Sequence, residues 1–245
     1  MTPVFCKIND PANIGDSLCC PRDYFPEFKD CPLVDIREPL PGPVIFGGGG
    51  LLHEGVDVFM EQADPGSIVW GAGSNYHDPN HAPFPDWLDR FTFVGLRDFG
   101  NPWNYVPCVS CLHPEFDAPL GDPCHEAVVY EHHQVPVNIP DLPRMNNGLP
   151  AGEFGSVLRF LASGRLVLTN TYHGAYWASL LGRPVVIINP FSSRFHRLKP
   201  AVAFATEDNW RDAVSAALAR TGYLQECRTI NQRMFKKVQE ILKRP

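Results

Sequence analysis

The chain has 245 residues, a formal net charge of −6 at pH 7 and an apolar share of 44%, which is the composition of an ordinary globular protein. Its acidic balance argues against bulk binding to nucleic acid, which needs a basic surface. No apolar run approaches membrane-spanning length, and the first residues lack the basic flank and apolar core of a signal peptide. We therefore expect a cytoplasmic protein that associates with membranes at most peripherally.

The first half of the chain alternates apolar runs with polar, glycine-rich turns. Buried strands are predicted at residues 4–8, 33–36, 43–46, 67–75 and 91–98. Short helices are expected at residues 56–62 and 87–90. This alternation is typical of a parallel sheet with crossover helices. In such a sheet the residues that follow the strands share one edge, where α/β proteins bind ligands.

Residues 101–123 are rich in Pro, Cys and short polar residues. We interpret this stretch as the crossing between two domains, at 1–120 and 121–245. Here Cys108, Cys111 and His113, followed by Cys124 and His125, have a spacing that would permit a tetrahedral zinc site. No second Cys-x-x-Cys or His-x-x-x-His pair accompanies them. Reduced, unliganded thiols are therefore the preferred interpretation, and no metal is expected.

The second half is organised around one strand–helix–strand unit. Apolar runs at 166–169 and 185–188 predict buried parallel strands. Residues 175–181 between them suit a packed helix, which Gly182 and Pro184 end.

Three further elements are predicted in this half: a strand at 127–130, an amphipathic helix at 153–162 and a C-terminal helix at 225–243. The adjacent His132 and His133 would point to opposite faces if the strand continued, so they make a poor metal pair. The last helix has a basic face that an anionic membrane would attract. Its apolar stripe favours packing against the protein, back across the N-terminal domain.

The turn between the two central strands is the expected place for chemistry, and it consists of Asn170, Thr171, Tyr172, His173 and Gly174. Unpaired amides at a helix N-terminus favour an anion. A histidine at this position can donate or take up a proton near neutral pH. The alternative role of His173 is to cap the helix.

Two turns of the first half carry further candidates. Asp16 follows the first strand and suits reading or deprotonating a hydroxyl, although Asn13 or Asp16 could instead cap a helix. A glycine run lets main-chain amides approach a phosphate or a sugar. We expect Gly48, Gly49 and Gly50 to shape the floor of a cleft.

Cationic side chains follow strands in both halves. The guanidinium of Arg97 suits two parallel hydrogen bonds to a carboxylate or phosphate, and its alternative partner is Asp98 in an ion pair. After the strand at 185–188, a local basic patch indicates an anionic ligand and consists of Arg194, Arg197 and Lys199. A solvated loop is the alternative interpretation of this patch.

Together these motifs resemble the polysaccharide pyruvyl transferase family, in order along most of the chain. The matching segments are NIGD at 13–16, VIFGGGGLL at 44–52, GLRD at 95–98, LTNTYHG at 168–174 and LGRPV at 181–185. The resemblance implies two Rossmann-like halves with parallel sheets that face a cleft, similar to GT-B glycosyltransferases. It also implies phosphoenolpyruvate as the donor substrate, no cofactor, and a glycan or lipid-linked sugar as the acceptor that receives a pyruvyl ketal.

By analogy with the family histidine, His173 is expected to be the principal acid/base, and Asp16 to orient or deprotonate the acceptor hydroxyl. Family members often carry an arginine two residues before the motif histidine, whereas this chain has Thr171. One anion contact is therefore missing or comes from elsewhere, with the basic patch as the candidate source.

Two other functions stay open at this point. A glycosyltransferase that uses a nucleotide sugar would employ the same cleft and basic patch, with His173 near the diphosphate. A non-catalytic glycan- or phosphate-binding relative that has kept the fold is the other, and the departure at Thr171 motivates it.

Overall fold

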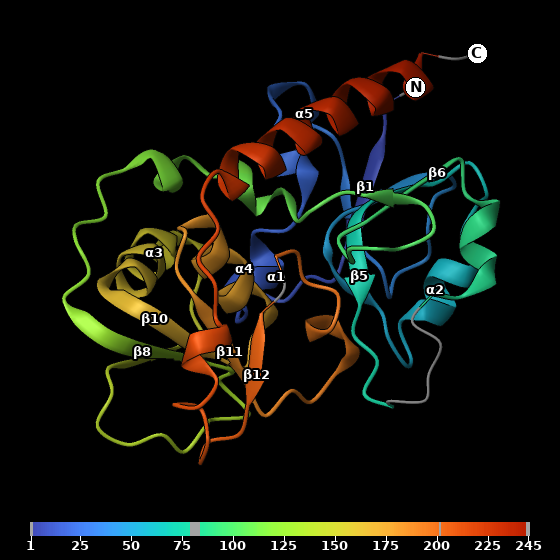
Figure 1. Cartoon of the computed structure of the whole chain (residues 1–245). Helices are drawn as coiled ribbons and strands as arrows, with labels where there is room; N and C mark the ends of the chain where they lie inside the picture. Colours follow the sequence, from blue (N-terminus) through green and yellow to red (C-terminus); the bar gives the residue numbers. More distant parts are fainter. Residues whose placement is uncertain (1, 79–83, 201, 244–245) are drawn as a thin grey trace.

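The computed structural model describes residues 2–78, 84–200 and 202–243, and their strands form two parallel sheets, one in each half of the chain (Figure 1). The prediction of an α/β fold in two halves is therefore confirmed. The change from one sheet to the other falls between β7 (Asn104–Tyr105) and β8 (His125–Glu131), within the stretch interpreted as a crossing. The domain boundary at residue 120 itself stays a prediction.

The N-terminal sheet has the strand order β2-β1-β3-β5-β6-β7, with β4 paired to β5. Its remaining strands are β1 (Val4–Lys7), β2 (Leu33–Asp35), β3 (Val44–Phe46), β4 (Gly49–Leu52), β5 (Ile68–Ser74) and β6 (Phe93–Leu96). All residues of β3 and β5 are buried, as expected for continuous apolar runs in a parallel sheet that is covered on both faces. The helices of this half are α1 (Ile14–Ser17) and α2 (Asp57–Glu61), with the 3-10 helices η1 (Pro21–Asp23), η2 (Pro26–Phe28), η3 (Asp86–Arg90), η4 (Val109–Leu112) and η5 (Pro114–Asp117).

The C-terminal sheet has the strand order β12-β11-β10-β8-β9. Its further strands are β9 (Arg144–Asn146), β10 (Gly164–Thr169), β11 (Val185–Ile188) and β12 (Ala203–Ala205). The helices are α3 (Phe154–Ser163) and α4 (Tyr172–Leu180), with the 3-10 helices η6 (Ala151–Glu153), η7 (Ser193–Phe195) and η8 (Val214–Ala216). Every residue of α4 is buried, because this helix lies between its own sheet and the N-terminal half.

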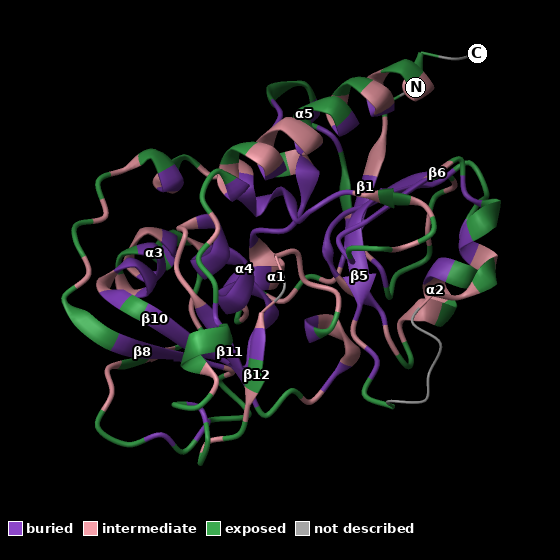
Figure 2. Cartoon of the chain, in the orientation of Figure 1, coloured by how far each residue is buried: buried purple, intermediate pink, exposed green. Residues whose placement is uncertain are grey.

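The last helix, α5 (Tyr223–Leu242), runs across both halves (Figure 1). Asn231 Oδ1 accepts a hydrogen bond of 2.9 Å from the buried Trp70 indole of β5, and the Phe235 ring stacks on Phe25 at 4.3 Å. Buried residues follow its inner face and exposed residues its outer face (Figure 2). The predicted packing against the protein is thus confirmed. None of the helices in the described ranges combines the length and apolar character that crossing a bilayer requires.

The two halves meet where the strands of both sheets end. The loop after β11 crosses to the N-terminal half, where Ser193 Oγ lies 2.6 Å from Ser74 Oγ and the Ser193 amide donates to the Tyr76 carbonyl at 2.8 Å. On the other side, the Ile14 amide donates to the Asn147 carbonyl at 3.2 Å. Helix α1, which begins at Ile14, makes the second contact and lies next to α4 (Figure 1).

Candidate active site

A cavity of about 390 Å³ lies between the halves and is lined by residues that follow strands of both sheets. The predicted site residues that line it are Asp16, Gly50, Arg97, Thr171, Tyr172, His173 and Arg194. A larger cavity of about 520 Å³ lies beside α2, around Leu40 and Phe59, and contains none of the predicted residues. We place the site in the smaller cavity because ligands of open α/β sheets bind beyond the carboxyl ends of the strands.

Arg97 follows β6 and is 4% exposed. Its guanidinium carbon lies 3.6 Å from the centre of the Tyr172 ring, a cation–π contact that stabilises a charge removed from water. The ion pairs of the described residues do not include one between Arg97 and Asp98, and the Asp98 carboxylate accepts the Ser74 amide at 3.0 Å. Among the described residues, no hydrogen bond or ion pair occupies the Arg97 guanidinium, so its donors remain available to a ligand.

Arg194 enters the cavity from the loop after β11. Its Nη2 donates weakly to the Asn170 carbonyl at 3.5 Å, and its guanidinium lies 4.6 Å from the Phe191 ring centre. The buried Nε has no partner within the described part of the chain. Burial and the nearby charge of Arg97 lower the pKa of Arg194 to about 10. Two cations that repel each other in one cavity favour an anion there.

His173 lies in the first turn of α4 and is 8% exposed. Its Nε2 lies 3.5 Å from the Cys108 sulfur, and its ring centre lies 5.0 Å from that of Trp177. Burial, followed by the charges of Arg97 and Arg194, lowers the pKa of His173 well below its usual value. The imidazole is therefore neutral at neutral pH while no anion offsets these charges.

The short helix α1 brings Asp16 to the cavity that His173 also lines. Asn13 is the N-cap: its Oδ1 accepts the Gly15 amide at 3.1 Å, and its Nδ2 donates to Asp16 Oδ2 at 2.9 Å. Asp16 is thus not the cap, and it faces the cavity. Burial raises the pKa of Asp16, and the charges of Arg97 and Arg194 oppose that rise.

Gly15 leaves the space that the histidine ring occupies. A Cβ at Gly15 would lie 2.1 Å from His173 Nδ1, a separation that no side chain tolerates. A glycine in the NIGD segment is thus required by close approach of the ring, a role that the sequence analysis did not assign.

The start of α4 offers main-chain donors as well. Thr171 Oγ1 accepts the Gly174 amide at 2.9 Å and caps the helix, so His173 does not have this capping role. The amides of Tyr172 and His173 have no hydrogen-bond partner in the described ranges, which leaves them available to an anion.

Asn170 and Gly174 support the turn without lining the cavity. The Asn170 side chain accepts from the His132 amide at 2.8 Å and donates to the Val135 carbonyl at 2.7 Å, which ties the end of β10 to the end of β8. A Cβ at Gly174 would lie 2.5 Å from both Thr171 Oγ1 and the Tyr130 ring. These two residues therefore hold the turn in place.

The three glycines expected on the cleft floor do not act together. Gly50 lines the cavity, and a Cβ there would lie 2.8 Å from Asn75. Gly49 begins β4 with a φ of +100°, and the Gly48 amide donates to the Cys19 carbonyl at 2.9 Å. Gly48 and Gly49 thus make internal main-chain contacts because the run forms a strand and not an open loop.

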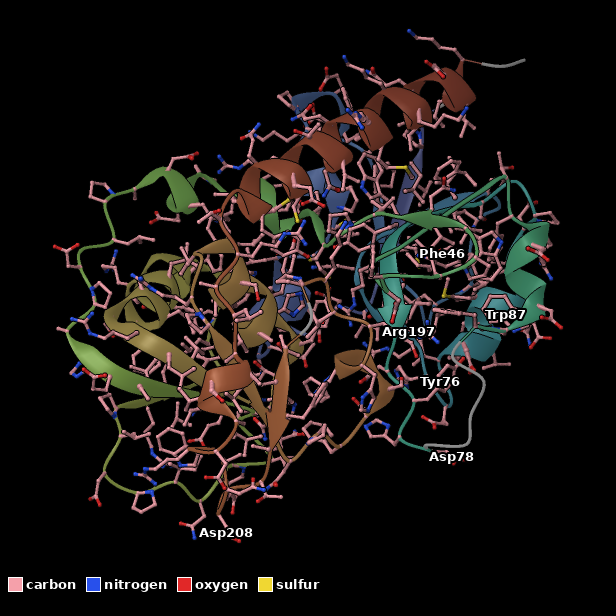
Figure 3. The ribbon with its side chains drawn as sticks, viewed as in Figure 1. Phe46, Tyr76, Asp78, Trp87, Arg197 and Asp208 are labelled. Atoms are coloured by element: carbon pink, nitrogen blue, oxygen red, sulfur yellow. The ribbon has the colours of Figure 1, made fainter. Side chains whose placement is uncertain are left out.

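The other two cations of the basic patch make contacts outside the cavity. The Arg197 guanidinium lies 4.7 Å from the Phe84 ring centre, and Arg197 is seen over the N-terminal half (Figure 3). Lys199 Nζ forms an ion pair of 2.9 Å with Glu226 and lies 4.5 Å from the Phe99 ring centre. Neither residue lines the cavity, so Arg194 is the member of the patch that can contact its ligand.

The cysteines that permitted a zinc hypothesis have different surroundings. Cys108 lies beside His173, whereas Cys111 accepts a hydrogen bond from Asn231 and Cys124 is exposed. The described residues contain no group of three or more His, Cys, Asp or Glu side chains that could hold a metal ion.

Sequence analysis missed several polar residues of the cavity, namely Asn75, His132, Gln134 and Asn147. Asn75 Oδ1 is buried without a partner in the described ranges. Burial and Arg194 lower the pKa of His132 to about 4. Because β8 ends at Glu131, the rings of His132 and His133 stack at 4.9 Å instead of pointing to opposite faces. Asn75 and His132 follow predicted strands, which is the one signal that could have found them; Asn147 lies in a segment with no such signal.

Comparison with known proteins gives information on the fold and none on the function. The chain is similar to the crystal structure of a functionally uncharacterized protein from Klebsiella pneumoniae subsp. pneumoniae, with 20% identity and a TM-score of 0.50 over 84% of this chain and 93% of that one. No family model matches the chain, and no curated protein matches it.

Proposed function

We propose that the protein is a cytoplasmic pyruvyltransferase that moves the pyruvyl group of phosphoenolpyruvate onto a sugar of a surface or extracellular polysaccharide and forms a cyclic ketal. The observation that supports it most strongly is that one cavity brings together two buried guanidiniums, Arg97 and Arg194, an imidazole, His173, and a carboxyl group, Asp16. In this proposal the two halves act as the Rossmann-like domains of a GT-B-like enzyme.

The cationic end of the cavity suits a donor with two anionic groups. Phosphoenolpyruvate carries a carboxylate and a phosphate, and each can take paired hydrogen bonds from a guanidinium. Within the described residues, the Arg97 guanidinium and Arg194 Nε have donors without a partner, and the first amides of α4 add main-chain donors. In this account Arg194 takes the place of the family arginine that Thr171 replaces.

The other end of the cavity suits hydroxyl groups. Asn13 and Asn147, which hydrogen-bond to each other at 3.4 Å, line it with Gln134. Asn75 Oδ1, which has no partner among the described residues, is an acceptor that a sugar hydroxyl can satisfy. Uncharged amides beside a carboxyl group can both donate to and accept from a polyol.

The reaction has a simple balance. C3 of phosphoenolpyruvate gains a proton and becomes a methyl group, one sugar hydroxyl adds to C2, and the bond from C2 to the phosphate oxygen breaks. A second hydroxyl of the same sugar then adds to C2 and closes the ketal. Of the two hydroxyl protons, one ends on C3 and the other on the departing phosphate.

His173 and Asp16 are assigned the proton transfers. Bound phosphoenolpyruvate offsets the guanidinium charges that lower the pKa of His173, so the imidazole can take up a proton and deliver it to C3. The pKa of Asp16, raised by burial, makes its carboxylate a stronger base for the acceptor hydroxyl. Removal of His173 should lower the rate about 100-fold or more.

A phosphate-release assay with phosphoenolpyruvate and a panel of galactosides, mannosides and N-acetylhexosamines tests the proposal. We expect release that depends on one acceptor class and is lost in His173→Gln. Arg194→Gln should weaken phosphoenolpyruvate binding, whereas Arg197→Gln, which removes a guanidinium outside the cavity, should not. Transfer from a nucleotide sugar but not from phosphoenolpyruvate would identify a glycosyltransferase. Binding without turnover of any donor would identify a non-catalytic relative.

A further inference from the structure

A row of polar side chains runs from the core of the C-terminal half to the candidate catalytic imidazole. The Trp177 indole donates to Ser110 Oγ at 3.0 Å, Ser110 Oγ lies 3.3 Å from Cys108 Sγ, and Cys108 Sγ lies 3.5 Å from His173 Nε2. Trp177, Ser110 and Cys108 are all fully buried. None of these three residues lines the cavity, so the row approaches the imidazole from behind.

The direction of the hydrogen bonds follows from the first donor. An indole N–H can only donate, so Ser110 Oγ accepts from Trp177. Cys108 Sγ is then the one acceptor among the described residues for the Ser110 hydroxyl proton, and His173 Nε2 is the one acceptor for the Cys108 thiol proton. Every donor in the row is satisfied only if the protons point from Trp177 toward His173.

The two nitrogens of His173 therefore have different surroundings. Nε2 faces the buried Cys108 thiol, whereas Nδ1 lies against Gly15 and makes no hydrogen bond within the described ranges. The hydrogen bond to one ring nitrogen decides which nitrogen carries the proton in a neutral imidazole. Here an acceptor role for Nε2 leaves the proton on Nδ1.

We propose that Cys108 is a positioning residue whose thiol holds Nε2 of His173, so that Nδ1 is the nitrogen that presents its proton to the cavity. A thiol suits this role because it can both donate and accept. It donates to Nε2 while the imidazole is neutral, and it accepts from Nε2–H once the ring has gained a second proton. Nδ1 carries a proton in both states.

Cys108 is not a nucleophile in this arrangement. Burial is the main cause that raises the pKa of its thiol, and the pKa of His173 is lowered, so the pair is a neutral thiol and a neutral imidazole. Reactive cysteines need the thiolate and partial exposure, and Cys108 has neither.

Nitrogen-15 NMR of labelled histidine in the protein without substrate tests the proposal directly. The His173 signals are identified by their loss in His173→Gln. We expect a protonated Nδ1 and an unprotonated Nε2 near neutral pH. In Cys108→Ala the Nε2–H form should gain population, and in Cys108→Ser, which keeps a hydroxyl donor, it should not. An Nε2–H form in the unmodified protein, or an unchanged tautomer in a folded Cys108→Ala, would overturn the proposal.

The kinetic consequence rests on the proposed function. Cys108→Ala should lower kcat about tenfold or more with little change in KM for phosphoenolpyruvate, because orientation of the acid is lost while anion binding is kept. Cys108→Ser should restore most of kcat. Cys6→Ala, which shortens an equally buried cysteine in β1, is the matched control and should leave kcat within about twofold.

The two proposals fail in different ways. Absence of phosphoenolpyruvate turnover removes the proposed function and leaves the NMR result to decide the role of Cys108. Normal turnover together with a tautomer that ignores Cys108 removes the positioning role and leaves the function.

Discussion

Replacing Gly15 by alanine is a sharp test of the site geometry. Gly15 lies within α1, where alanine suits the backbone better than glycine. The new Cβ would lie 2.1 Å from His173 Nδ1, whereas an ordinary contact needs at least 3.4 Å. The ring must therefore move by more than about 1 Å, against the Cys108 and Trp177 side chains that pack behind it.

A displacement of about 1 Å at a reacting group costs on the order of 100-fold in rate. We therefore expect Gly15→Ala to lower kcat for phosphate release by about this factor, with a stability loss of about 1–3 kcal/mol from overpacking. Phosphate release under saturating phosphoenolpyruvate and acceptor measures the first effect, and urea unfolding measures the second.

Gly152→Ala is the matched control, because a Cβ at Gly152 would meet no atom of the described residues within 4 Å. It should change neither kcat nor stability. If folded Gly15→Ala kept kcat within about threefold of the unmodified enzyme, His173 would not be the proton donor that the account requires.

Three further predictions concern charge. Phosphoenolpyruvate binding should take up a proton, because the anion raises the lowered pKa of His173, so affinity should increase as the pH falls below neutral. Calorimetry in buffers of different ionisation enthalpy measures the uptake. Arg97→Gln should weaken phosphoenolpyruvate binding about 10- to 100-fold, because a hydrogen bond to a charged group contributes about 1.5–3 kcal/mol. Lys199→Gln should not weaken binding. Titration calorimetry measures both affinities. Asp98→Asn should stabilise the fold above pH 6 by up to about 3 kcal/mol. Burial raises the pKa of Asp98 from 3.8 to about 6, so the stability that the neutral carboxyl group provides below pH 3.8 is lost as the pH rises through 6. Urea unfolding of both proteins near pH 4 and pH 8 measures the difference.

Each of these predictions has a contradicting result. Proton uptake that persists in His173→Gln would assign it to another group. Equal affinities of the Arg97 and Lys199 variants for phosphoenolpyruvate would mean that the cavity is not the anion site. An Asp98→Asn advantage that stays the same near pH 4 and pH 8 would mean that ionisation of the carboxyl group is not its cause.

The parallel sheets, and the sheet edges at which ligands bind, could be predicted from local sequence. Short apolar runs such as Val185–Ile188 predict buried parallel strands whatever surrounds them. Because the ends of parallel strands share an edge, Arg97 and the turn that contains His173 could be assigned to the ligand-binding edges of their sheets. How the two halves face each other was not needed for this assignment.

The direction of side chains in the connecting loops could not be predicted. Arg194, Arg197 and Lys199 are close in sequence, yet one enters the cavity and two bind the N-terminal half or α5. That outcome depends on where the loop after β11 crosses the interface, through Ser193. A local charge pattern contains no information about such a contact.

Contacts between residues that are distant in the sequence could not be predicted either. The Cys108–His173 contact joins positions 65 residues apart, and Cys108 drew attention in the sequence only as a possible zinc ligand. The NIGD segment indicated a ligand loop, but the need for glycine at position 15 comes from the packing of α1 against α4. Neither follows from the spacing of residue types.

The most direct test of the account is mass spectrometry of a sugar panel after incubation with the enzyme and phosphoenolpyruvate, with inorganic phosphate measured in the same samples. The account predicts one acceptor class that gains the mass of a pyruvyl ketal in equal amount to the phosphate released, and no product with His173→Gln. Phosphoenolpyruvate that stays intact with every acceptor, while a nucleotide sugar is consumed, would contradict it.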